Sequence, residues 1–106
     1  MSKMIVPQYK LLMWYDINRG IHETYFQFIA GEFVPTLQGL GLYMLQVYDT
    51  AFGHYPMRQL EFVAEDLETM QTALSSDTWH DLKARFDKYT SNYRQKIVRF
   101  RDAFQF

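Results

Sequence analysis

The sequence predicts an α+β protein of the ferredoxin-like class, with the element order β-α-β-β-α-β and a four-stranded antiparallel sheet. Three observations support this prediction. Four segments have the alternating or doubly apolar pattern of strands. Two regions carry apolar residues at helical spacing. With 106 residues, the chain is long enough for one modest core, so we expect a single domain over residues 1–106, with residues 1–8 as a loose lead-in.

The first half of the chain predicts a strand followed by a helix. We expect the strand at Tyr9–Ile17, where both sets of alternating residues are largely apolar, a pattern typical of strands covered on both faces. Asn18-Arg19-Gly20 is expected to form a turn. A helix should then run from Ile21 to about Leu40. Pro35 should kink or close it, because proline lacks the backbone N–H and clashes with the preceding turn.

A second helical region follows Asp66, whose carboxylate is well placed to cap the first turn. A break near Ser75-Ser76-Asp77 predicts either two short helices or one kinked helix. The apolar residues at helical spacing are Leu67, Met70, Leu74, Trp79, Leu82, Phe86 and Tyr89. Such a stripe, even with aromatic residues in it, is usually core packing.

Three further strands are expected at Leu42–Asp49, Met57–Glu65 and Tyr93–Phe104. Two helices can cover only one face of the resulting sheet. We expect the other face to need a cover because of its apolar residues, which we take to include Met13, Tyr15, Met44 and Tyr48. A second copy of the chain is the simplest cover, giving a homodimer and a dimeric α+β barrel with two-fold symmetry. The aromatic content of 18% favours such an interface.

Composition excludes several kinds of function. A net charge of −1 does not favour nucleic-acid binding, despite basic residues at Arg94, Lys96, Arg99 and Arg101. The absence of cysteine excludes disulfides and thiolate chemistry. We expect no membrane span and no signal peptide, and therefore a cytoplasmic protein. His22, His54 and His80 lack metal-ligand spacing, so no metal and no cofactor are expected.

Three residues are candidates for catalysis. His54, in the connection between the second and third strands, could act as a base near neutral pH; the alternative is an exposed loop histidine. Arg58 and Arg99 could bind an anion or polarise a carbonyl if either points into the barrel. Their alternative is a surface position or a salt bridge with Glu61. Gln46 and Gln59 are further polar residues on strands.

Aromatic residues on the strands suggest a binding pocket. Trp14, Tyr15 and Tyr48 could line a mostly apolar site beside Arg58 and Arg99. The alternative is that these rings pack only against neighbouring strands.

Several short motifs are spread over the chain. They are Arg19-Gly20 after the first strand, Glu32, Pro35, Leu37 and Gly41 around the first helix exit, Gly53 in the hairpin loop, Asp66-Leu67, Leu74, Ser76-Asp77 and Trp79 in the second helical region, and Val98-Arg99 and Phe104 near the end. Together these motifs resemble the NIPSNAP-like proteins of the dimeric α/β-barrel superfamily. The chain departs from the family pattern at His54-Tyr55-Pro56 and Phe62.

The resemblance implies the fold and the dimer, whereas relatives differ widely in activity. They include cofactor-independent monooxygenases, haem-degrading enzymes, isomerase-like enzymes and proteins without a known activity. Two hypotheses follow. The first is a protein that binds a small apolar or aromatic ligand inside the dimeric barrel, without a defined activity. The second is a cofactor-independent monooxygenase, or a related small enzyme, that acts on an aromatic substrate.

Overall fold

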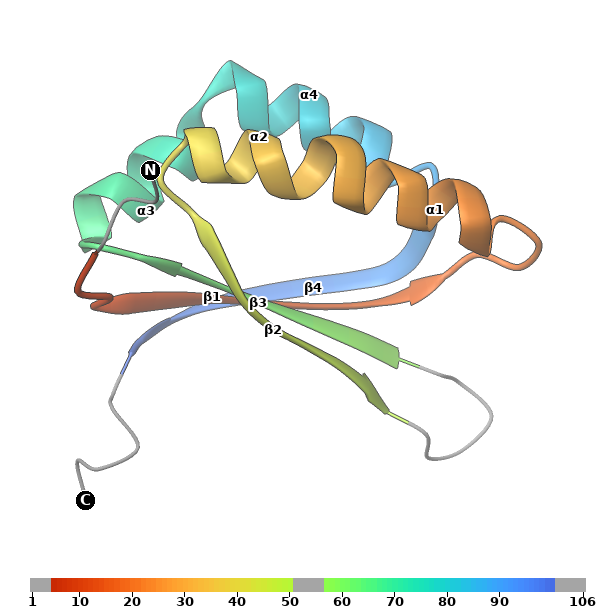
Figure 1. Ribbon diagram of the computed structural model, residues 1–106, viewed down its shortest axis with the longest axis horizontal. Helices are drawn as coiled ribbons and strands as arrows, with labels where there is room; N and C mark the ends of the chain where they lie inside the picture. The colour runs from red at the N-terminus through yellow and green to blue at the C-terminus, as the bar shows by residue number, and fades with distance from the viewer. Residues whose placement is uncertain (1–4, 51–56, 101–106) are drawn as a thin grey trace.

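The sheet has four antiparallel strands, and all helices lie on one side of it (Figure 1). The computed structural model describes residues 5–50 and 57–100. The strands, in the spatial order β2-β3-β1-β4, are β1 (Tyr9–Ile17), β2 (Tyr43–Thr50), β3 (Met57–Ala64) and β4 (Thr90–Arg99). The predicted ferredoxin-like fold is therefore confirmed, with the first strand in the interior of the sheet.

The first helix continues past Pro35 instead of closing there. It consists of α1 (His22–Phe28), a π-helical turn η1 (Ile29–Phe33) and α2 (Val34–Gly39). The N–H of Val34 donates to the carbonyl of Ile29, five residues back. This wider turn makes room for Pro35, whose ring would collide with the preceding turn of an α-helix. The proline thus widens the helix locally, and the chain keeps its direction over the sheet.

The second helical region forms two helices, α3 (Leu67–Ser75) and α4 (Asp77–Phe86). The predicted cap is present: the Thr69 N–H donates to Asp66 Oδ1 at 2.7 Å, and this hydrogen bond lowers the pKa of the Asp66 carboxyl. Ser76 has an extended backbone, with ψ 153°, and its Oγ accepts from the Trp79 N–H at 3.1 Å. Ser76 therefore ends one helix and caps the next.

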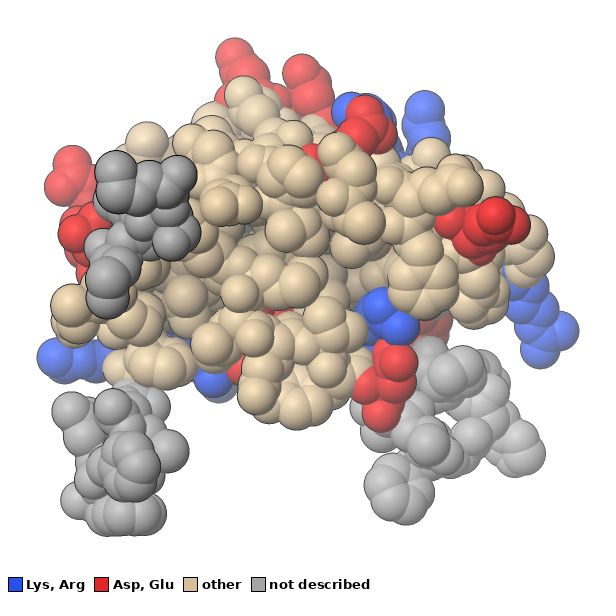
Figure 2. Space-filling model, in the orientation of Figure 1, with Lys and Arg blue, Asp and Glu red and all other residues tan. Residues whose placement is uncertain are grey.

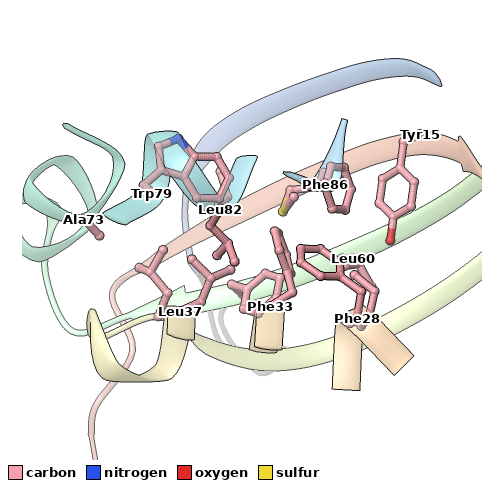
Figure 3. Packing of buried hydrophobic residues seen from close by; sticks show 14 of the residues in the cluster. Tyr15, Phe28, Phe33, Leu37, Leu60, Ala73, Trp79, Leu82 and Phe86 are labelled. Atoms are coloured by element: carbon pink, nitrogen blue, oxygen red, sulfur yellow. The ribbon is translucent and has the colours of Figure 1, made fainter. Parts of the chain in front are cut away.

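The hydrophobic core lies between the helices and one face of the sheet. Leu11, Met13 and Tyr15 alternate along β1 and are fully buried beneath the helices. Phe86 of α4 stacks on Phe33 with 4.8 Å between ring centroids, and it packs against Tyr15 in a T-shaped arrangement with 4.7 Å between centroids (Figure 3). Aromatic rings from both helical regions thus pack together above β1.

The last strand starts and ends earlier than the sequence predicted. It spans Thr90–Arg99, whereas alternation predicted Tyr93–Phe104; Phe104 lies outside the described residues. The register with β1 shifts between Trp14 and Asp16, and Asn92 has a left-handed backbone with φ 57°. A bulge at this point breaks the period-two pattern, which is why the first residues of the strand do not show strand-like alternation.

We expect Phe86→Ala to destabilise the protein by roughly 3–5 kcal/mol, because it removes a fully buried ring that contacts three other aromatic residues. Urea denaturation followed by circular dichroism measures this loss. Phe26→Ala is the matched control, since Phe26 is half exposed, and should cost about 1 kcal/mol. Equal losses in the two variants would contradict the packing described above.

Candidate functional site

The sheet face opposite the helices carries many polar and aromatic side chains, and we call it the uncovered face. No helix of the described chain lies on that side (Figure 1). Residues paired directly across antiparallel strands point to the same face. Among the residues whose side chains are described, the strand registers therefore assign fourteen to the uncovered face: Lys10, Leu12, Trp14 and Asp16 of β1, Tyr43, Gln46 and Tyr48 of β2, Gln59, Glu61 and Val63 of β3, and Ser91, Arg94, Lys96 and Val98 of β4.

A chain of polar contacts crosses the middle of the uncovered face. The Trp14 indole Nε1–H donates to Gln59 Oε1 at 2.7 Å. Gln59 Nε2 then donates to Glu61 Oε2 at 2.7 Å. Lys10 Nζ forms an ion pair with Glu61 Oε1 at 2.9 Å. Because the indole can only donate and the carboxylate can only accept, the orientation of the Gln59 amide is determined.

Glu61 is almost fully buried although its sheet face has no covering layer. It is 5% exposed, and the neighbouring Val63 is 6% exposed. A carboxylate so far from water requires charged or hydrogen-bonded partners, which Lys10 and Gln59 supply. This part of the uncovered face is therefore already organised within one chain.

The edge strand β2 exposes apolar side chains. Leu45, Val47 and Tyr48 are each more than 40% exposed. Figure 2 shows that most charged side chains lie around the rim of this view, whereas the middle of the molecule is neither acidic nor basic. The sheet register shifts between Met44 and Gln46, which indicates a bulge at Leu45. An edge strand with exposed apolar residues favours association with another chain.

A second polar cluster lies on the other side of the sheet, beneath α1. The hydroxyl groups of Tyr15 and Tyr25 share a hydrogen bond in the buried core. The Arg58 guanidinium lies over the Tyr25 and Phe26 rings, at 5.7 and 4.7 Å from their centroids. Arg58 also donates to both carboxylate oxygens of Asp49, at 2.9 and 3.1 Å. The charge of Arg58 is therefore balanced within the chain.

Burial is the main cause that raises the pKa of both phenols in this cluster above the ordinary value. For Tyr15, the neighbouring Tyr25 raises the pKa further. For Tyr25, the hydrogen bond with Tyr15 and the positive charge of Arg58 act in the opposite direction. Both hydroxyl groups are therefore neutral at physiological pH, and neither is available as a phenolate base.

The structure does not bring the predicted site residues together. Trp14 and Tyr48 lie on the uncovered face, but Tyr15 is adjacent to Trp14 in β1 and points to the helices. Arg58 pairs with Tyr15, whereas Arg99 pairs with Tyr9. Six residues of strand separate these partners, or about 20 Å. The five predicted residues therefore do not line one common pocket within a single chain.

The predicted set of residues on the uncovered face also needs correction. Met13 and Tyr15 are fully buried under the helices, and Met44 packs against the same core. Only Tyr48 of the four lies on the uncovered face. The sequence could not assign the faces, because β1 is apolar on both sides and a shift of one residue exchanges the two sets.

Both candidate arginines lie on the helix side of the sheet, so neither points toward the interior of a barrel formed by the uncovered faces. Arg58 pairs with Asp49, and Glu61 pairs with Lys10, so the predicted alternative of an Arg58–Glu61 salt bridge is not observed. Arg99 is exposed at the end of β4. His54 lies outside the described residues.

Three partners that organise these clusters were not predicted from the sequence: Lys10, Tyr25 and Asp49. Lys10 is a cation within an otherwise apolar strand, and this position could have indicated that it pairs with a carboxylate such as Glu61. Tyr25 was assigned only to the apolar stripe of its helix, and its hydroxyl gives no local signal.

In residues 5–50 and 57–100, no three potential ligands converge into a group that could hold a metal ion. No helix in the same ranges is long and apolar enough to cross a membrane.

Comparison with known proteins identifies the fold. No protein-family model matches the sequence, and no curated protein is significantly similar to it. An uncharacterised NIPSNAP domain protein from Burkholderia xenovorans has a TM-score of 0.66 at 11% identity, over 91% of this chain and 96% of its own. A NIPSNAP family protein from Agrobacterium tumefaciens has a TM-score of 0.67 at 12% identity, over 97% and 94%.

A third structure broadens this comparison. A protein of unknown function from Bacteroides thetaiotaomicron, described as a possible oxidoreductase, has a TM-score of 0.65 at 7% identity, over 89% of this chain and 98% of its own. At these identities the likeness shows the fold alone. The chain therefore has the fold of NIPSNAP-family proteins, as its resemblance implied, and its function must be argued from its own residues.

We expect the buried tyrosine pair to make the protein less stable at alkaline pH. Above about pH 10 the phenols ionise in the unfolded chain, while burial keeps them protonated in the folded chain. Their contribution to stability is thus present below pH 10 and is lost as pH rises toward the folded pKa. The loss should approach about 1.4 kcal/mol per phenol for each pH unit.

Urea denaturation between pH 8 and pH 11 tests this expectation. The double variant Tyr15→Phe with Tyr25→Phe should lose less stability over this range than the wild type, although it starts lower at pH 8. We compare how steeply the free energy of unfolding falls with pH in the two proteins. This comparison cancels the contribution of Tyr93, whose raised pKa is common to both. Identical slopes would show that the pair ionises normally.

Proposed function

We propose that the protein is a homodimer in which two uncovered faces pack together as a barrel, and that the barrel holds a small apolar or aromatic ligand. The observation that carries this proposal is the composition of the uncovered face. It combines apolar and aromatic side chains, such as Leu12, Trp14 and Val98, with an organised chain of polar contacts. A layer of this kind needs a cover, and a second copy supplies one with two-fold symmetry.

The same composition favours a ligand over a fully packed interior. Seven of the fourteen residues assigned to the uncovered face carry charged or amide groups: Lys10, Asp16, Gln46, Gln59, Glu61, Arg94 and Lys96. A dry contact between two such faces would remove many polar groups from water without partners, at a cost of several kcal/mol. Water or a ligand between the sheets would satisfy these groups, and Trp14 and Tyr48 provide aromatic surface for an apolar body.

We expect native mass spectrometry of the purified protein to show a dimer, with additional mass if the ligand stays bound. Size exclusion with light scattering should confirm the dimer at micromolar concentration. Tyr48→Asp should weaken dimerisation by at least tenfold, because it places a carboxylate in the interface. Since Tyr48 is half exposed in the single chain, this variant should still fold.

Gln27→Glu is the matched control for added negative charge. Gln27 lies on α1 and is exposed, so this variant should remain dimeric. If the wild type is a monomer at micromolar concentration, the proposed dimeric barrel is contradicted. A Tyr48→Asp variant that dimerises as well as the wild type would show that the uncovered faces are not the interface.

A cofactor-independent monooxygenase, or a related small enzyme acting on an aromatic substrate, is the second candidate. The observation that favours it is Arg58, which lies close to the buried tyrosine pair and follows His54 by four residues in the sequence. In this hypothesis His54 removes a proton from the substrate, and Arg58 stabilises the oxyanion. Arg58 is already paired with Asp49, which reduces its capacity for that role.

Oxygen consumption with an acidic aromatic substrate such as anthrone tests the enzyme hypothesis. If the hypothesis is right, the wild type should consume oxygen, and His54→Ala should lower the rate by about a hundredfold, the usual contribution of a general base. His80→Ala is the control, because His80 is exposed on α4. A rate unaffected by His54→Ala would exclude this mechanism.

A further inference from the structure

The hydrogen-bonding groups of the uncovered face differ in how far they are available to a ligand. The acceptors in the middle of the face are engaged within the chain: Gln59 Oε1 accepts from Trp14, and Glu61 Oε2 accepts from Gln59. Gln46 Oε1 accepts from the Tyr48 hydroxyl. Glu61 Oε1 pairs with Lys10, and the side chain of Glu61 is too deeply buried to offer its remaining lone pairs.

Donors are left over on the same face. The Gln59 amide has a second N–H beyond the one given to Glu61, and the ammonium of Lys10 has two N–H groups beyond the one facing Glu61. Lys96 is exposed, and its ammonium carries three donors. A ligand that complements this arrangement must therefore bring acceptors.

Charge leads to the same conclusion. The described residues of the uncovered face include three cations, Lys10, Arg94 and Lys96, and two carboxylates, Asp16 and Glu61. Each chain thus contributes an excess of one positive charge, although the whole chain has a net charge of −1. Enclosure between two sheets would strengthen this field, because charges interact more strongly where water is excluded.

The positions of the two lysines define where an anion would bind. Lys96 lies directly opposite Leu12 on the neighbouring strand, and Lys10 precedes Leu12 by two residues on the same face. Diagonal neighbours of this kind are about 7–8 Å apart, within reach of long side chains. Trp14 follows on the other side of Leu12, and the Arg94 guanidinium lies over its ring at 5.8 Å from the centroid. Apolar and aromatic surface therefore lies between the two ammonium groups and a further cation.

We propose that the ligand of the dimer is a small aromatic acid bound as its anion, with the carboxylate at Lys10 and Lys96 and the ring on Leu12 and Trp14. This inference rests on the proposed homodimer and adds the charge and chemical class of its ligand. Asp16 lies outside the proposed site, at the far end of β1 from Lys10. Its Oδ2 accepts from the Asn92 side chain at 2.8 Å, and its Oδ1 is buried without a hydrogen-bond partner in the described part of the chain.

Isothermal titration with three matched probes tests this inference: 2-naphthoate, the neutral 2-naphthalenemethanol and the cationic 2-naphthylmethylammonium. The rings are identical, so differences in affinity report the charge preference of the site. We expect 2-naphthoate to bind at least tenfold more tightly than the alcohol, and the ammonium compound to bind most weakly. The preference should decrease as salt concentration rises.

Lys96→Gln should lower the affinity for 2-naphthoate by about five- to tenfold and leave the affinity for the alcohol unchanged. Lys88→Gln is the matched control, because Lys88 is exposed after α4 on the helix side of the fold, and it should change neither affinity. Lys10 is not a suitable test position, since its replacement would also leave Glu61 without its cation.

The outcomes separate the inference from the proposed function. If an intact dimer binds the alcohol or the ammonium compound as tightly as 2-naphthoate or more tightly, the inference that the ligand is an anion is overturned. This result leaves the proposal of an aromatic ligand in place. No binding of any probe, with the dimer intact, overturns the ligand itself and the inference with it. Binding of 2-naphthoate that Lys96→Gln leaves unchanged overturns the assigned position.

Discussion

The position of β1 in the interior of the sheet is the constraint on which the rest of this structure depends. Its odd-numbered side chains, Leu11, Met13 and Tyr15, are fully buried against the helices. Strand geometry then requires Leu12 and Trp14 to point to the opposite face. The same nine residues thus build the core and present an apolar, aromatic surface on the other side. A strand that is apolar on both sides is typical of sheets covered on both faces, which favours the proposed second copy as a cover.

The element order could be predicted from the sequence because each element has a strong local signal. Asp66 and Ser76 cap their helices through side chains that can be recognised from sequence. The helix around Pro35 was predicted in extent but not in form, because the π-helical turn depends on how the chain relieves one steric clash. The start of β4 was missed because the bulge at Asn92 removes the alternating pattern.

The candidate site could be predicted only in part, since side-chain partners are set by tertiary structure. Trp14 and Tyr48 were correctly expected on strands, but only the sheet register shows that Tyr15 belongs to the opposite face. The partners of Arg58 and Glu61 are Asp49 and Lys10, one from each neighbouring strand. No local pattern distinguishes these pairs from an Arg58–Glu61 salt bridge, which the sequence allowed equally well.

The two polar clusters differ in what they leave unsatisfied, and this difference decides between the candidate functions. Beneath α1, Arg58 is neutralised by Asp49 and lies on aromatic rings, so little of its charge remains for a substrate. On the uncovered face, Lys10 is likewise paired with Glu61. Lys96, in contrast, is exposed, and the Gln59 amide keeps a second N–H beyond the one given to Glu61. A binding site is defined by groups whose requirements the protein itself does not meet. The uncovered face has such groups, and the cluster beneath α1 mainly stabilises the fold.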